Sequence, residues 1–201
     1  MRIRTIVVGI AALALLAGCG DSGGTTGTPT TATQPSSTSD SGGAPKIENP
    51  LDVKAFEADP CSTVTPAQVE AFGLPGVTGR VNTTSPGASC AWLGLSIPAK
   101  MAPSVTILPE GTNLSTILPN KDTTYEKFES LPAIQGYPTY MALVADSRKN
   151  GYCSVLVGVS EQKVLLISLQ SDQGSPKFAD PCAAITEFAN LAITTIKAGA
   201  K

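Results

Sequence analysis

The chain has 201 residues, with 14 basic and 16 acidic side chains, no histidine and five cysteines. A chain without histidine cannot form the serine–histidine or cysteine–histidine pairs of most hydrolases, and it lacks a usual ligand of zinc. The basic residues are scattered along the sequence, so we expect no surface that follows a phosphate backbone and no nucleic-acid partner.

The first 18 residues have the layout of a bacterial lipoprotein signal peptide. Two arginines precede an apolar run, Ile6–Ala17, which is shorter than the roughly 20 residues of a membrane-spanning helix. The run ends in Leu16-Ala17-Gly18-Cys19, which resembles the lipobox. We therefore predict that residues 1–18 are removed and that Cys19 is acylated, for example with palmitate, which holds the mature protein at the extracytoplasmic face of the cell membrane. The alternative is an ordinary secretory signal whose Cys19 pairs with another cysteine.

Residues 19–58 are predicted to comprise the lipidated Cys19 and a disordered tether. From Gly20 to about Pro45 the segment consists mostly of serine, threonine, glycine and proline, without any aromatic or large aliphatic side chain. Such a segment cannot bury enough apolar surface to fold. Residues 59–201 then remain as a single globular domain.

A short helix is predicted from Pro66 to the residue before Gly73. Thr65 is a suitable N-cap, Pro66 fits the first helical turn, and Gln68 completes a capping box. Glycine at position 73 then favours the end of the helix.

The middle of the domain shows a hydrophobic pattern with a period of two, which indicates β-strands. The predicted strands are Cys90–Trp92, Val105–Ile107, Tyr137–Val144, Cys153–Val159 and Lys163–Leu169. A short turn, Ser160–Gln162, joins the last two, so we expect them to form a hairpin.

A long terminal helix is predicted from Pro181, with Asp180 as its N-cap. Apolar residues then recur on one helical face, at Ile185, Phe188, Ala189, Ala192, Ile193 and Ile196. The predicted fold class is therefore α+β: a twisted antiparallel sheet with a short N-terminal helix and a long C-terminal helix, stapled by two disulfides.

Four cysteines remain when Cys19 is set aside, in a compartment that we expect to be oxidising. Metal binding is the alternative, but the chain has neither histidine nor a CxxC spacing, so we predict no metal site and no cofactor. The local pairing Cys61–Cys90 with Cys153–Cys182 is favoured because it closes two short loops of equal length. The crossed pairing, Cys61–Cys182 with Cys90–Cys153, stays open.

Short motifs around the cysteines follow one another along the chain: Asp59-Pro60-Cys61, Cys90-Ala91-Trp92, Phe128-Glu129, Gly136-Tyr137-Pro138, Tyr152-Cys153-Ser154-Val155-Leu156-Val157 and Asp180-Pro181-Cys182. With the lipobox and the tether, they resemble the DUF3558 group of actinobacterial lipoproteins, a domain of unknown function that includes mycobacterial LprB-type lipoproteins. Thr139 departs from the group, which prefers alanine or valine there. The resemblance implies an extracytoplasmic, membrane-anchored protein and supplies no catalytic residues.

Two sets of residues were candidates for catalysis. Asp122, Glu126 and Glu129 include the carboxylates that a glycosidase would need, although a solvated strand or loop face is favoured for them. The segment Ser160–Lys163 matches the S-x-x-K string of penicillin-binding proteins, but it lies in a predicted turn where that chemistry requires a helix. We therefore predict that neither set is catalytic.

Four aromatic residues, Trp92, Tyr137, Tyr140 and Tyr152, are candidates for lining a ligand groove, although we expect Trp92 to pack against the disulfide of Cys90. The favoured function is a non-catalytic binding or accessory module of the cell envelope, with a lipid, glycan, peptide or protein partner. The alternative is an envelope hydrolase that acts on cell-wall glycan or peptide through carboxylate or serine–lysine chemistry. An apolar groove favours the first, and a polar cleft with two facing carboxylates favours the second.

Overall fold

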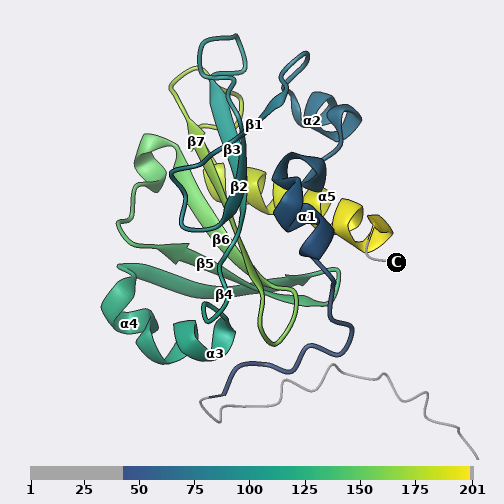
Figure 1. Cartoon of the computed structure of the whole chain (residues 1–201). Helices are drawn as coiled ribbons and strands as arrows, with labels where there is room; N and C mark the ends of the chain where they lie inside the picture. The colour runs from purple at the N-terminus through teal and green to yellow at the C-terminus, as the bar shows by residue number, and fades with distance from the viewer. Residues whose placement is uncertain (1–42, 200–201) are drawn as a thin grey trace, which may run out of the picture. The chain divides into compact units, whose positions relative to one another are not determined.

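Residues 43–199 are described by the computed structural model, in which seven strands form one antiparallel sheet (Figure 1). The strands are β1 (Gly79–Val81), β2 (Ala88–Trp92), β3 (Met101–Ile107), β4 (Lys127–Ile134), β5 (Tyr137–Leu143), β6 (Tyr152–Gly158) and β7 (Val164–Ser171). The helical segments are α1 (Lys54–Ala58), η1 (Pro60–Thr63), α2 (Pro66–Phe72), α3 (Leu114–Ile117), η2 (Leu118–Asn120), α4 (Lys121–Thr124), η3 (Arg148–Asn150) and α5 (Pro181–Gly199). The predicted α+β class is confirmed, while the predicted signal peptide, Cys19 and residues 20–42 lie outside the described residues.

The two helices predicted from capping signals both form where expected. Thr65 and Gln68 make a reciprocal capping box at the start of α2, and Gly73 ends the helix in the left-handed region at φ 109°. In α5, the Asp180 carboxylate accepts a hydrogen bond from the backbone amide of Ala183 at 3.0 Å. The apolar stripe predicted for this helix is fully buried against the sheet. Within residues 43–199, no helix has both the length and the apolar character that crossing a membrane requires.

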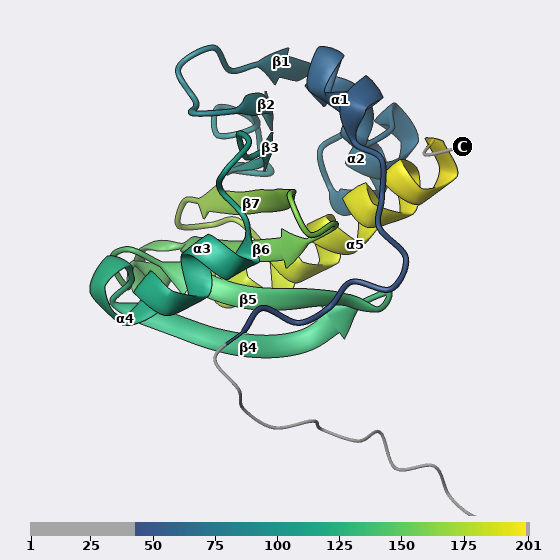
Figure 2. The same cartoon turned by 60° about the horizontal axis from the view of Figure 1, so that its bottom comes forward.

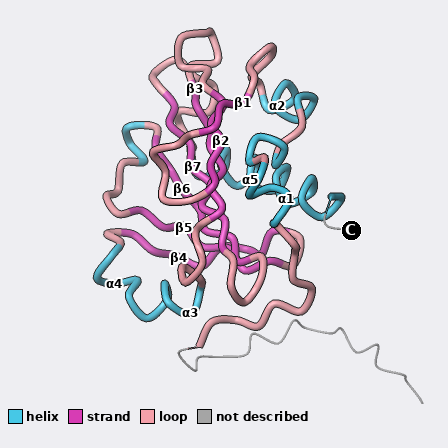
Figure 3. The backbone as a smooth tube through the Cα atoms, in the orientation of Figure 1, coloured by secondary structure: helices cyan, strands magenta, loops and turns pink. Residues whose placement is uncertain are grey.

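The strands run across the sheet in the order β1-β2-β3-β7-β6-β5-β4. The five predicted strands correspond to β2, β3, β5, β6 and β7, and β6 and β7 form the predicted hairpin. The edge strands β1 and β4 and the short helices α3 and α4 were not predicted (Figure 3). Strand β7 lies between β3 and β6, so segments that are far apart in the sequence form the centre of the sheet.

Each face of the sheet carries its own hydrophobic cluster. On one face α5 packs along the strands with α1 and α2 close by (Figure 2). This side holds the main core, which includes Trp92 and Phe188. Their rings meet edge to face, with centroids 5.3 Å apart. On the opposite face α3 and η2 cover a smaller cluster that includes Leu114, Ile117 and Leu156. Strand β6 is therefore buried on both sides.

The folded domain begins before the predicted boundary at residue 59. Helix α1 occupies part of the segment assigned to the tether, and Val53 and Phe56 are buried in the main core. The chain before α1 is attached to the sheet as well, because the amide of Leu51 donates to the carbonyl of Val159 at 2.8 Å. The boundary at residue 59 was therefore wrong, since a few isolated apolar residues in a polar segment are enough to dock it.

The disulfides join Cys61 to Cys90 and Cys153 to Cys182, which confirms the favoured pairing and excludes the crossed one. In each bond one cysteine lies at the start of a helical segment, η1 or α5, and the other is fully buried on a strand, β2 or β6. Each bond thus holds a helical element against the core face of the sheet.

Candidate functional site

A pocket of about 360 Å³ lies on the sheet face opposite α5. We call it the tyrosine pocket, and its lining residues are Leu108, Thr112, Tyr125, Ala142, Val144, Ala145, Ser147, Tyr152, Ser154, Leu156 and Leu166. Its size lies at the lower end of the range for small-molecule sites, about 300–1,000 Å³. The pocket adjoins the smaller hydrophobic cluster, with which it shares several leucine and tyrosine side chains.

Side chains alternate between the two faces of each strand, and this alternation identifies the residues of the pocket floor. In β6, Ser154 and Leu156 point away from α5, because Cys153, Val155 and Val157 belong to the main core. Leu166 of β7 is paired with Leu156, and Ala142 of β5 lies on the same face. The Ser154 hydroxyl donates to the carbonyl of Ala142, so this polar group is satisfied within the floor. Small side chains at Ala142 and Ser154 leave the hollow between the larger leucines.

Two tyrosines belong to the pocket wall. Tyr152 begins β6, and Tyr125 follows α4; both are half-buried. Tyr125 lies next to Phe128, which stacks on Tyr140 with ring centroids 5.2 Å apart, so the wall continues into an aromatic row. Burial raises the pKa of the Tyr125 phenol above its ordinary value, which keeps this hydroxyl protonated and able to donate.

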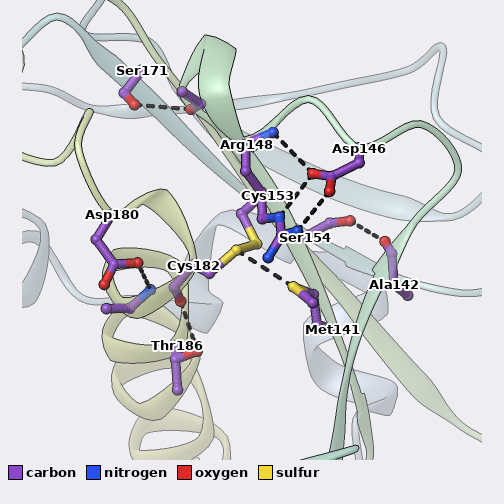
Figure 4. The surroundings of a disulfide bond; sticks show 12 residues. Met141, Ala142, Asp146, Arg148, Cys153, Ser154, Ser171, Asp180, Cys182 and Thr186 are labelled. Atoms are coloured by element: carbon purple, nitrogen blue, oxygen red, sulfur yellow. Dashed lines mark hydrogen bonds and ion pairs between the residues drawn. A yellow bond between two sulfur atoms is a disulfide. The ribbon is translucent and has the colours of Figure 1, made fainter. Parts of the chain in front are cut away.

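The loop between β5 and β6 separates this pocket from a second, charged one. Ala145 and Ser147 line the tyrosine pocket, whereas Asp146 and Arg148 line a hollow of about 500 Å³ next to the start of α5. The guanidinium of Arg148 donates to both carboxylate oxygens of Asp146 at 2.7 and 2.6 Å (Figure 4). These hydrogen bonds lower the pKa of Asp146 to about 2, so the pair stays ionised over the physiological range. The lining of the tyrosine pocket itself contains no charged side chain.

The candidate catalytic carboxylates each have a local partner. Asp122 pairs with Lys121 and Glu129 with Lys127, at the surface. The carboxylate of Glu126 accepts from the backbone amide of Asp146 at 2.9 Å and so holds the loop after β5. Among residues 43–199, no group of three or more acidic, cysteine or histidine side chains is placed to hold a metal ion.

The serine and lysine of the S-x-x-K string lie in the turn between β6 and β7. Lys163 pairs with Glu57 at 2.6 Å, which ties the turn to α1. The string therefore lacks the helix on which penicillin-binding proteins present their serine and lysine.

Comparison with protein families assigns the chain to a known family. The family DUF3558, described as a protein of unknown function, matches residues 14–195. The chain belongs to this family. The family inferred from the cysteine motifs is thus confirmed, and its description assigns no activity. No curated protein and no solved structure matches the chain.

In this DUF3558 domain, the four aromatic residues singled out in the sequence have different roles. Tyr152 lines the tyrosine pocket, and Tyr140 lies in the adjoining aromatic row. The Tyr137 hydroxyl instead donates to the carbonyl of Asn49 at 2.8 Å and holds the segment before α1. Trp92 is buried in the main core, where its ring packs on Phe188. Tyr125, which also belongs to the pocket wall, was missed because it stands alone between polar residues and belongs to no periodic pattern.

Proposed function

We propose that this protein is a lipoprotein of the extracytoplasmic face of the cell membrane, and that its domain is a non-catalytic binding module. The lipobox at Cys19 and the preceding apolar run support acylation and anchoring. The two disulfides support export, because such bonds persist in oxidising compartments and are rare in the cytosol.

The tyrosine pocket is the feature of the structure that best supports a binding role. Ligand sites are typically concave and mostly apolar, with a few polar groups that orient the bound molecule. The pocket has leucine, valine and alanine side chains on its floor and rim, with hydroxyl groups of serine, threonine and tyrosine among them. The candidate catalytic carboxylates are engaged in ion pairs or backbone contacts outside this pocket, which favours binding over hydrolysis.

Anchoring is tested by replacing Cys19 with alanine. Metabolic labelling with a palmitate analogue should mark the parent protein and leave Cys19→Ala unlabelled, and the variant should leave the membrane fraction or stay unprocessed with its domain folded. Ser22→Ala, a neighbouring change in the tether, should remain labelled and bound to the membrane. Retention of the label by Cys19→Ala would rule out this lipidation site. Since the other four cysteines are paired with one another, the variant should keep both disulfides.

Binding is tested by native mass spectrometry of the protein recovered from the cell envelope. We expect a bound species that is lost in Val144→Asp, because Val144 is 70% exposed at the pocket rim and the carboxylate would face an apolar ligand. Val81→Asp is the matched control, since Val81 is 58% exposed and lies on the edge strand β1, outside the pocket. A protein without any bound molecule or partner would count against the binding role.

A further inference from the structure

The absence of charged side chains from the tyrosine pocket restricts the class of ligand that it can hold. Its lining contains no aspartate, glutamate, lysine or arginine. Asp146 and Arg148, which alternate with the lining residues Ala145 and Ser147 in the loop, are paired with each other and line the second hollow. A charged group inside the tyrosine pocket would lose its hydration without gaining an ionic partner, which is costly. The pocket therefore favours an uncharged ligand.

The residues of the pocket floor come from four neighbouring strands. The floor extends from Leu108, directly after β3, over Leu166 of β7 and Leu156 of β6 to Ala142 of β5. Neighbouring strands are about 4.8 Å apart, so four strands span roughly 14 Å. A pocket of only about 360 Å³ across these strands fits one aliphatic chain better than several chains.

A row of hydroxyl groups continues from the floor across the sheet. Ser154, Ser168 and Ser104 are paired residues on β6, β7 and β3, and their side chains point to the same face. Ser168 and Ser104 are half-buried and share a hydrogen bond of 2.8 Å. The pocket is therefore apolar at its floor and has an uncharged polar strip beside it.

Two tyrosines of the pocket lining carry further hydroxyl groups. Tyr125 and Tyr152 both line the pocket, and among residues 43–199 no hydrogen bond of either phenol is found. A hydroxyl or ester group of a ligand would supply a partner that donates to or accepts from these phenols.

We propose that the tyrosine pocket binds a neutral amphiphile with a single aliphatic chain and a hydroxylated head, of the monoacylglycerol type. The chain lies over the leucine and alanine floor, and the head meets the phenols and the Ser104–Ser168 strip. This assignment rests on the proposed binding function and names the ligand class for the same site.

The test uses the whole mature chain, residues 19–201, with Cys19→Ala so that it carries no acyl chain of its own. Isothermal titration compares monodecanoylglycerol with decanoate and decyltrimethylammonium, all below their micelle concentrations. The three probes have chains of matched length, so they isolate the effect of head-group charge. We expect the neutral probe to bind at least about tenfold more tightly than either ion. Equal or tighter binding of an ion would overturn the proposed class.

Pocket variants connect the binding to the site. Val144→Asp should weaken monodecanoylglycerol binding by about tenfold or more, while Val81→Asp should leave it unchanged. Tyr125→Phe and Tyr152→Phe should each weaken it by about two- to tenfold, the usual effect of losing one hydrogen bond. Ser168→Ala should reduce the affinity for the glycerol head and leave decanoate binding unchanged. Equal losses in the two valine variants would mean that the amphiphile binds elsewhere.

Native mass spectrometry distinguishes failure of this inference from failure of the proposed function. If no amphiphile binds but the envelope-derived protein carries another molecule that Val144→Asp removes, the ligand class is wrong and the binding function stands. If no amphiphile binds and the envelope-derived protein carries neither a ligand nor a partner, both proposals fail.

Discussion

The two disulfides close loops of identical length, which makes a quantitative prediction for stability. Cys61 and Cys90 are separated by 29 positions, and so are Cys153 and Cys182. The loop-closure relation assigns about 3.5 kcal/mol at 25 °C to a cross-link of this span, because it restricts the unfolded chain. Cys90 and Cys153 are both fully buried, and their partners are both partly exposed, so the packing lost on substitution is also similar. We expect nearly equal losses when either bond is removed.

Paired alanine variants test this expectation without leaving a lone thiol. Cys61→Ala with Cys90→Ala, and Cys153→Ala with Cys182→Ala, should each lower the free energy of unfolding by about 3.5 kcal/mol in urea titrations, with a steeper dependence on urea because the unfolded chain exposes more surface. Removing both bonds should cost about 7 kcal/mol, which is comparable to the total stability of many domains, about 5–15 kcal/mol. A loss below about 1 kcal/mol for one bond, with the expected loss for the other, would refute the loop-entropy argument.

Two further predictions concern the loop between β5 and β6 and its surroundings. Asp146 should titrate at about pH 2, not at its ordinary value of 3.8, because Arg148 donates to it. Arg148→Ala should therefore move the midpoint of an NMR titration up towards 3.8. Since the pKa is lowered in the folded state, the contribution of this pair to stability is complete above the unfolded pKa and is lost as the pH falls through about 2. Gly151→Ala should be strongly destabilising, by about 3 kcal/mol or more, because its φ is +75° and the new Cβ would lie 2.1 Å from the carbonyl oxygen of Ser171. Gly76→Ala is the control, since its φ of +71° is similar but no atom lies within 4 Å of the new Cβ. We expect this control to lower the free energy of unfolding by about 1 kcal/mol in thermal or urea unfolding. Equal losses in the two variants would contradict the steric argument.

The elements that were predictable from the sequence are those set by local chemistry. Thr65 and Gln68 define the start of α2 through contacts within one turn, and Asp180 does the same for α5. The alternation in β6 and β7 needs only neighbouring residues to be recognised. The cysteine pairing followed from two equal loops, and the structure shows that pairing.

The parts of the fold and of the pocket that were not predicted depend on contacts between segments far apart in the sequence. Strand β4 contains Pro132, and its burial does not alternate along the chain, so it has no clear period of two and forms by pairing with β5 at the sheet edge. The predicted end of the tether was wrong for a similar reason. Phe56 is buried only because the sheet and α5 provide a surface for α1. The course of α3 and α4 brings Tyr125 to the pocket, and the residues next to Tyr125 in the sequence do not predict that course.

The tyrosine pocket itself follows from the incomplete cover on one face of the sheet. Strand β6 is buried on both sides, yet α3 and η2 cover only part of the face opposite α5. Beyond their edge the side chains are small, at Ala142 and Ser154, where a larger aliphatic residue would fill the hollow. For folding alone, valine at position 142 would bury more apolar surface than alanine, so Ala142→Val should leave the free energy of unfolding unchanged or raise it. The same change would shorten the floor on which we place the aliphatic chain. A variant that gains stability while losing the amphiphile would therefore separate the demands of folding from those of binding at this face.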